Sequence, residues 1–116
     1  MKTLFILNDP PYGTERSYNG LRLARALSKN EGNEIRVFLL GDAALCAKAG
    51  QKVPQGYYSI EFFIESILRR NAQIGVCGTC LEARGIQDSE LIEGAHHSTM
   101  DQLAEWTEWA DKVLAF

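Results

Sequence analysis

The chain alternates short apolar runs with longer segments in which apolar residues recur every three or four positions. Thr3 to Leu7 is a short apolar run without period-2 alternation, which is typical of a strand covered on both faces in a parallel sheet. Pro10, Pro11 and Gly13 exclude a helix directly after this run. Residues 8–13 are therefore expected to form a loop at the carboxyl end of the first strand.

A helix and a second strand are expected next. Thr14 or Ser17 can cap the helix, which should end between residues 30 and 33. Residues 34–40 predict a strand, after which Asp42 is expected to cap a short helix over residues 43–49. The predicted apolar face of the first helix, at helical spacing, consists of Gly20, Leu23, Ala24 and Leu27.

The clearest helical pattern lies in the middle of the chain, where Ser59 is expected to cap a helix. Its apolar positions follow the i, i+3, i+4, i+7, i+8 pattern and are Ile60, Phe63, Ile64, Ile67 and Leu68. Residues 73–76 predict a third strand that leads to Cys77. Beyond it we expect a loop with one helical turn over residues 90–93.

The last part of the chain predicts a helix and a strand. Thr99 to Gln102 fits a capping box, and the helix that it opens should bury Leu103, Trp106 and Ala110. Residues 112–116 predict a final strand. The order β-α-β-α-α-β-loop-α-β predicts an α/β fold with a parallel sheet between helices, in a single domain over residues 1–116.

Composition narrows the class of protein. The net charge of −3 and the lack of a basic stripe argue against a nucleic-acid partner. The apolar start breaks at Asn8 before a signal-peptide core is complete, and no stretch approaches the roughly 20 apolar residues that cross a bilayer. Three cysteines, an odd number, fit poorly with a secreted disulfide framework. A cytoplasmic protein with reduced thiols and no membrane contact is expected.

Candidate chemistry concentrates at Cys77-Gly78-Thr79-Cys80. Ligands of parallel sheets bind outside the carboxyl ends of strands, so this segment and the loop over residues 8–13 can meet. A cysteine reacts as the thiolate, which a nearby cation stabilises, and Arg84 or Arg22 could supply that cation. Gly78 lets the backbone approach a ligand and direct N–H groups at a sulfur anion.

Four interpretations of the two cysteines stay open from the residues alone. They are inert buried packing, a zinc ligand pair, thioredoxin-like disulfide chemistry, and sulfur handling in which a thiolate accepts and donates a sulfane sulfur. Zinc needs two further donors, and the adjacent His96 and His97 lack the usual spacing, so no metal or cofactor is expected. We expect those histidines to form a solvated loop pair and Cys46 to pack in the core.

Several segments together carry a resemblance to a known family. They are residues 6–15 with 21–24, residues 50–52, Cys77-x-x-Cys80-x-x-x-Arg84-Gly85-Ile86, and residues 106–114. Their order and spacing resemble the DsrE/DsrF family, specifically its YchN-like branch, essentially end to end. The resemblance implies a three-layer α/β/α domain with a mostly parallel five-stranded sheet, assembled as a homotrimer or homohexamer.

The resemblance also implies roles for individual residues. In sulfur-relay members, a persulfide-carrying cysteine stands eight residues before the glycine of an Arg-Gly-Ile-like segment, and Cys77 stands eight residues before Gly85. Cys80 departs from that pattern, which leaves sulfur relay and redox chemistry both open. Asn8, Tyr12 and Gly13 would border the same pocket in a family-like fold.

The leading hypothesis is therefore a sulfur-transfer protein in which Cys77 accepts sulfur from a donor protein and passes it to an acceptor. Cys80 would resolve the persulfide as a disulfide, Arg84 would stabilise the anion, and Gly78 and Thr79 would contact the ligand. One alternative is a thiol-disulfide redox protein that uses the two cysteines. The other is a non-catalytic oligomeric binding module, in which Tyr12, Tyr57 and Tyr58 contact a ligand or another subunit.

Overall fold

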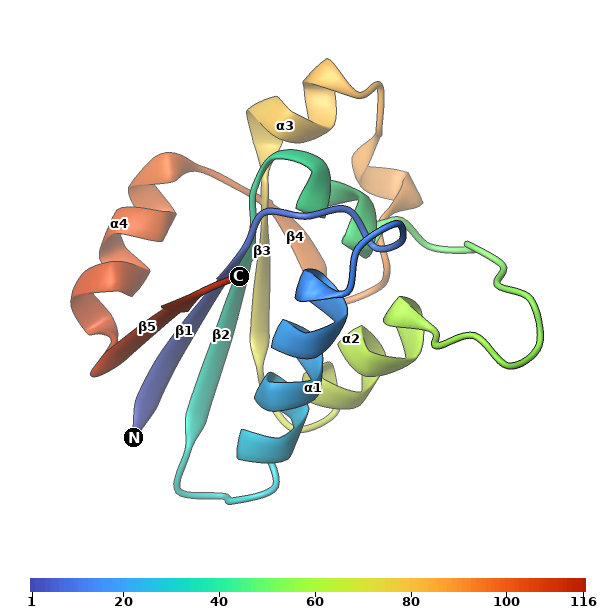
Figure 1. The fold of residues 1–116 in the computed structure, drawn as a ribbon. Coiled ribbons are helices and arrows are strands. Elements are labelled where there is room, and N and C mark those ends of the chain that lie inside the picture. Colours follow the sequence, from blue (N-terminus) through green and yellow to red (C-terminus); the bar gives the residue numbers. More distant parts are fainter.

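A five-stranded sheet forms the centre of the computed structural model, which describes residues 1–116 (Figure 1). The strand order is β4-β3-β2-β1-β5, and every neighbouring pair is parallel. The strands are β1 (Lys2–Leu7), β2 (Glu34–Leu39), β3 (Gln73–Cys77), β4 (Ala95–Ser98) and β5 (Lys112–Ala115). The predicted α/β fold with a parallel five-stranded sheet is confirmed.

Helices cover both faces of this sheet (Figure 1). On one face lie α1 (Arg16–Leu27) and α2 (Ile60–Leu68), and on the other lies α4 (Met100–Trp109). The short helices η1 (Gly41–Ala47), α3 (Gly78–Ala83) and η2 (Asp88–Glu90) gather near the carboxyl ends of the strands. No helix is long and apolar enough to cross a membrane.

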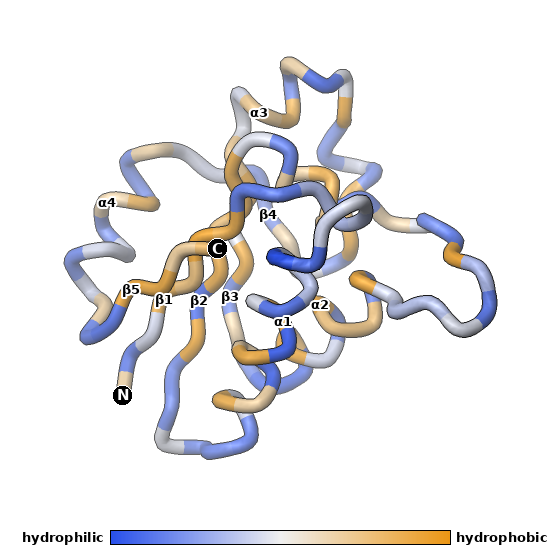
Figure 2. Tube along the Cα trace, viewed as in Figure 1, coloured by the Kyte–Doolittle hydropathy of each residue, from blue (hydrophilic) through white to orange (hydrophobic).

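The core consists of two layers that share the sheet. Phe5 points into the larger layer beneath α1 and α2, whereas Leu4 points into a smaller layer with Trp106 of α4. Successive side chains of a strand face opposite sides, so β1 must be apolar at nearly every position. Figure 2 shows the resulting hydrophobic strands beside hydrophilic connections.

Two of the predicted caps, those of α2 and α4, are present. The Ser59 Oγ accepts a hydrogen bond from the Phe62 amide, and the Thr99 Oγ1 accepts one from the Gln102 amide. The apolar face of α2 is buried at Ile60, Ile64 and Ile67 and half-buried at Phe63 and Leu68. In α4, Leu103 and Trp106 are buried, and Ala110 lies half-buried just beyond the helix.

The predicted N-cap of α1 is wrong, and its predicted apolar face is correct except at Leu23. Glu15 occupies the N-cap position without a side-chain bond, because the loop before the helix uses both predicted caps. Thr14 donates to the Asp9 carboxylate, and Ser17 donates to the Asp9 carbonyl oxygen. Gly20 and Ala24 are buried as predicted, whereas Leu23 is 39% exposed and Leu21 is buried in its place.

Three predictions near the carboxyl edge of the sheet also need correction. Asp42 lies inside η1 and pairs with Arg84, so it does not cap a helix over residues 43–49. The His96 and His97 pair lies in strand β4, and the expected turn at residues 90–93 falls at η2. The Cys77 segment continues directly into α3, where a loop was expected.

Candidate functional site

The two cysteines lie at the junction between β3 and α3. Cys77 is the last residue of β3 and the N-cap residue of α3, and Cys80 lies in the first turn of that helix. The turn brings the two Sγ atoms to 2.7 Å, and both cysteines are free thiols. The helix was missed because it has only six residues and is bracketed by two glycines, of which Gly85 ends it with φ +66°.

The hydrogen bonds make the two thiols unequal. The Cys80 thiol donates to the Cys77 Sγ, and the Thr79 Oγ1 lies 3.3 Å from the same sulfur. Burial opposes ionisation of Cys77, but these hydrogen bonds and the Thr79 and Cys80 amides hold its pKa below the ordinary value. Burial and the donated hydrogen raise the pKa of Cys80. Cys77 is therefore the thiol that ionises first.

The neighbouring end of β2 supplies contacts to Cys80. The Gly41 amide donates to the Cys80 Sγ at 3.1 Å, from a left-handed backbone conformation with φ +56°. Arg84 donates to the Asp42 carboxylate at 2.7 Å and to the Cys80 carbonyl oxygen at 3.1 Å. The Gly41 amide and the Arg84 charge each favour the Cys80 thiolate. The expected cation thus acts on the second thiol, and no cation is among the groups that lower the pKa of Cys77.

A histidine that the sequence did not assign to the site packs against Gly78. The His97 Nδ1 lies 2.9 Å from the Asp88 carboxylate, and its Nε2 faces Gly78. A Cβ added at Gly78 would lie only 1.9 Å from that Nε2, so the ring keeps this position only beside a glycine. No group of three or more His, Cys, Asp or Glu side chains is placed to hold a metal ion.

The residues of the loop after β1 lie in two separate parts of the structure. The Asn8 side chain donates to the Phe116 carbonyl oxygen, and the Asn8 carbonyl oxygen lies beside Gly41. Tyr12 and Gly13 instead line a separate cavity of about 420 Å³. The other residues that line this cavity are Thr14, Glu15, Lys52, Val53, Pro54, Tyr57 and Tyr58. Neither cysteine of the thiol pair lines it, so the expected single pocket is not formed within one chain.

Arg22 and Cys46, which were also considered from the sequence, lie away from the thiol pair. The Arg22 guanidinium donates to the Asn19 side chain and stacks over the Tyr18 ring. Cys46 is 1% exposed, as predicted for a core residue, and burial raises the pKa of its thiol to about 12. Cys46 therefore provides an inert thiol against which the reactivity of Cys77 can be compared.

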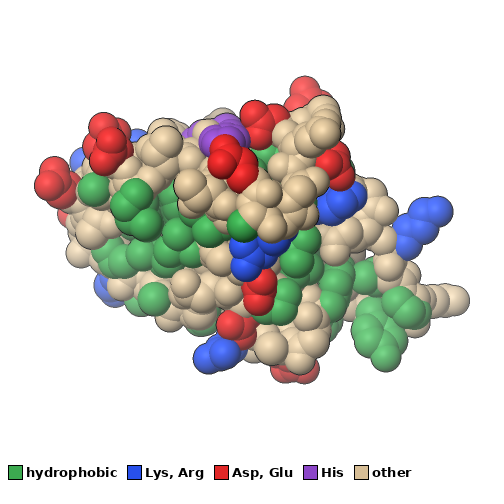
Figure 3. All heavy atoms as spheres, turned by 90° about the horizontal axis from the view of Figure 1, so that it is seen from above, with side chains coloured by type: hydrophobic (Ala, Val, Ile, Leu, Met, Phe, Trp, Pro, Cys, Tyr) green, Lys and Arg blue, Asp and Glu red, His purple; other side chains and the backbone are tan.

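The thiol pair can react with a partner that approaches the carboxyl edge of the sheet. Cys77 is 8% exposed and Cys80 is half-buried, so attack by Cys77 needs a reagent or partner thiol that reaches into the junction. Figure 3 looks onto this edge and shows hydrophobic side chains gathered on the side of α4 and β5, with acidic groups around them. The exposed hydrophobic residues of those two elements are Met100 and Val113.

Comparisons with known proteins match the chain along its whole length. A family model described as the DsrE/DsrF-like family matches residues 1–116. The chain is 41% identical over 116 residues to Protein YchN of Escherichia coli (strain K12), which covers 99% of this chain and 98% of that protein. It is 35% identical over 116 residues to Uncharacterized protein MJ0989 of Methanocaldococcus jannaschii, with 100% of both chains covered. The crystal structure of ychN protein from E. coli matches with a TM-score of 0.94 and 39% identity, over 100% of this chain and 99% of that one.

Proposed function

This chain belongs to the DsrE/DsrF-like family, and we propose that it transfers sulfur, with Cys77 as the thiolate that accepts a sulfane sulfur. The observation that carries the proposal is the hydrogen bond from the Cys80 thiol to the Cys77 Sγ at 2.7 Å. Because this bond lowers the pKa of Cys77 and raises that of Cys80, it prepares one sulfur for attack and keeps the other protonated. A persulfide acceptor needs one ionised thiol, and this asymmetry favours ionisation at Cys77.

The transfer is a pair of exchange reactions without net oxidation. The Cys77 thiolate attacks the outer sulfur of a donor persulfide, the donor S–S bond breaks, and the donor leaves as a thiolate with the bonding electrons. The outer sulfur, with its proton, is now bonded to the Cys77 Sγ. An acceptor thiolate then attacks that outer sulfur, and the Cys77 thiolate is regenerated.

Cys80 opens a second route, which is the basis of a redox function. Once Cys77 carries the extra sulfur, the Cys80 thiolate can attack the Cys77 Sγ and displace hydrosulfide, which leaves a Cys77–Cys80 disulfide. The two thiols are oxidised and the sulfane sulfur is reduced to sulfide. A dithiol reductant must then restore the pair. The separation of 2.7 Å between the sulfurs favours this second candidate function.

The remaining site residues have roles that follow from their positions. Thr79 donates to the Cys77 thiolate, and Gly78 leaves room for His97 beside the junction. Arg84 and the Gly41 amide stabilise Cys80 when it ionises for the resolving step. We place the sulfur donor and acceptor at the carboxyl edge, and we propose a homotrimer or homohexamer in which Asn8, Tyr12 and Gly13 contact a ligand.

The test is incubation with a small-molecule persulfide donor, followed by intact mass measurement of the wild-type chain and three cysteine variants. We expect the wild type and Cys46→Ser to gain sulfur or to form the disulfide, and Cys77→Ser to do neither. Cys80→Ser should retain the added sulfur, because the resolving thiol is gone. Equal sulfur uptake by Cys77→Ser would refute the proposal, and a disulfide without any sulfur-bearing intermediate would favour the redox function.

A further inference from the structure

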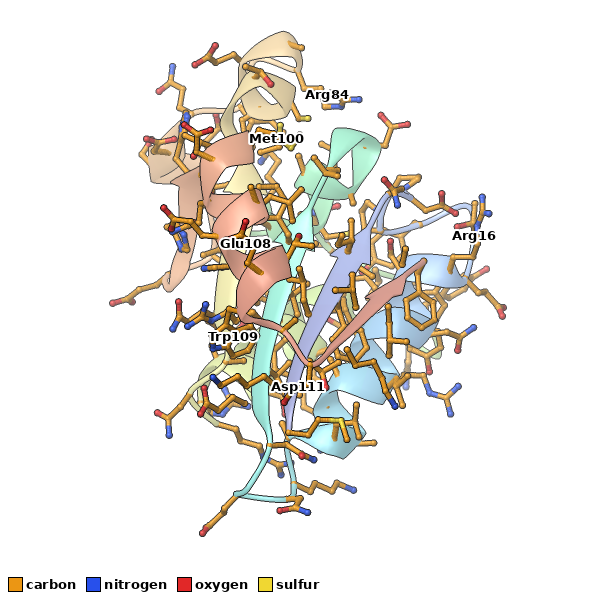
Figure 4. All side chains as sticks on the ribbon, turned by 90° about the vertical axis from the view of Figure 1, so that its left-hand side faces the viewer. Arg16, Arg84, Met100, Glu108, Trp109 and Asp111 are labelled. Carbon is orange, nitrogen blue, oxygen red and sulfur yellow. The ribbon has the colours of Figure 1, made fainter.

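A large polar cavity lies at the end of the sheet opposite to the thiols. It has a volume of about 700 Å³, and its lining includes Glu34 and Gln73, the first residues of β2 and β3. Cys77 lies at the other end of β3, roughly 13 Å away at the usual rise along a strand. Figure 4 shows Arg84 near one end of the molecule and Trp109 well away from it, at the far end of α4.

The cavity is positively charged in a chain whose net charge is −3. It is lined by more cations than carboxylates, and the charged residues are Lys29, Glu31, Glu34, Arg36, Arg69 and Arg70. The apolar lining is limited to Ile35 and Trp109, and amide side chains from Asn33, Asn71 and Gln73 complete the wall. This composition disfavours an apolar ligand and provides donors for an anion.

The Arg36 guanidinium packs against two tryptophan rings, but no group of the chain accepts a hydrogen bond from it. Its guanidinium lies 3.8 Å from the centre of the Trp109 ring and 5.3 Å from that of Trp106. No side-chain hydrogen bond or ion pair joins Arg36 or Arg70 to another residue of the chain. Every other arginine has such a partner: Arg16 pairs with Asp9, Arg22 with Asn19, Arg25 with Ser66, Arg69 with Glu65 and Arg84 with Asp42. Both arginines without a partner line this one cavity.

Helix ends explain only part of the positive charge. The carboxyl ends of α1 and α2 open onto the cavity, and cations such as Lys29 and Arg69 commonly offset the negative end of a helix. Arg36 lies within strand β2, and its guanidinium packs against the ring of Trp109, the last residue of α4. Burial lowers the pKa of Arg36, the Glu34 charge offsets only part of this effect, and an anionic ligand would offset more of it.

We propose that this cavity binds a small phosphate-bearing molecule through Arg36 and Arg70. A planar guanidinium forms two parallel hydrogen bonds with a phosphate group, and pairs of arginines are suited to a multiply charged anion. The volume falls within the usual range for small-molecule sites. The site is separate from the sulfur chemistry and does not depend on it.

The test uses pyrophosphate, titrated into the ¹⁵N-labelled chain at constant ionic strength. The indole N–H signal of Trp109, assigned with Trp109→Phe, reports on the cavity. We expect a saturable shift in the wild type and a dissociation constant at least about tenfold larger in Arg70→Gln, which is about 1.4 kcal/mol. Arg36→Gln should weaken binding as strongly, but it also removes the stacking on Trp109. Arg70→Gln, which changes an exposed side chain, is therefore the deciding variant.

Matched controls separate this site from general charge effects and from the thiol site. Arg22→Gln removes the same charge elsewhere and should bind like the wild type, as should Cys77→Ser. Citrate, titrated in parallel, distinguishes a carboxylate ligand from a phosphate ligand. The proposal is overturned if no saturable shift occurs, if Arg22→Gln weakens binding as much as Arg70→Gln, or if citrate binds and pyrophosphate does not.

Discussion

The Cys80 thiol donates its hydrogen to the Cys77 Sγ across 2.7 Å, so two cysteines of one motif have opposite pKa shifts. Cys77 gains the donors that favour an anion, whereas Cys80 must give up its proton beside a neighbouring negative charge. Because the two sites interact, the pair titrates as a unit, and the first proton to leave belongs to Cys77 in this geometry. This asymmetry leads to predictions about the reactivity of Cys77.

Removal of the Cys80 donor should raise the pKa of Cys77. In Cys80→Ala the Cys77 thiolate loses its strongest stabilising hydrogen bond, so the midpoint of its alkylation rate should move to higher pH. The wild-type rate should fall only as the pH drops through the lowered pKa. Iodoacetamide labelling across a pH series, read by peptide mass spectrometry, measures both midpoints. An unchanged midpoint in Cys80→Ala would show that the hydrogen bond does not tune Cys77.

Thr79→Val should slow the reaction of Cys77 without disturbing the fold. Valine keeps the branched shape of threonine but cannot donate to the sulfur. One net hydrogen bond contributes about 1 kcal/mol, so the alkylation rate at neutral pH should fall about fivefold. Thr79→Ser keeps the hydroxyl and serves as the control. Equal rates in the valine and serine variants would contradict a role for the Thr79 hydroxyl.

Gly78→Ala should destabilise the chain through a clash with His97. The added methyl would lie 1.9 Å from the His97 Nε2, so the ring must leave its contact with Asp88. We expect the free energy of unfolding to fall by about 1–3 kcal/mol, as is usual for overpacking. The double variant Gly78→Ala with His97→Ala should recover most of that loss in urea unfolding. If the double variant does not recover this free energy, the destabilisation has a cause other than the clash with His97.

The apolar face of α2 should be a main source of stability. Ile64 is fully buried, and Ile64→Ala should lower the free energy of unfolding by about 2–5 kcal/mol. Phe62, on the same helix, is 48% exposed, so Phe62→Ala serves as a control with a much smaller effect. Urea unfolding of both variants makes the comparison. Similar losses would contradict the assigned helix face.

Apolar patterning predicted most of the fold because β1, β2 and β3 bury mostly hydrophobic runs, and β5 is also mostly apolar although largely exposed. The fifth, β4, was missed because its sequence Ala-His-His-Ser is polar. It is an edge strand whose polar groups find partners nearby, since His96 and Ser98 contact the Gln102 side chain and His97 contacts Asp88. These contacts are local in sequence, but a hydrophobic pattern gives no sign of them.

The thiols themselves were predictable from their spacing, but their environment was not. Gly41 and Asp42 reach the pair only because β2 lies beside β3 in the sheet, which the order of elements along the chain does not specify. The expected meeting of Tyr12 with the thiols fails for the same reason, since β1 and β3 are separated by β2. The paired shifts in pKa follow from this three-dimensional arrangement.

The position of the first sulfur added by a persulfide donor tests the central claim most directly. In Cys80→Ser, where no resolving thiol remains, peptide mapping should find one extra sulfur on Cys77 and none on Cys46. An extra sulfur on Cys80 in the Cys77→Ser chain, at a yield equal to that on Cys77 in Cys80→Ser, would contradict the account. It would show that the two thiols are equivalent acceptors.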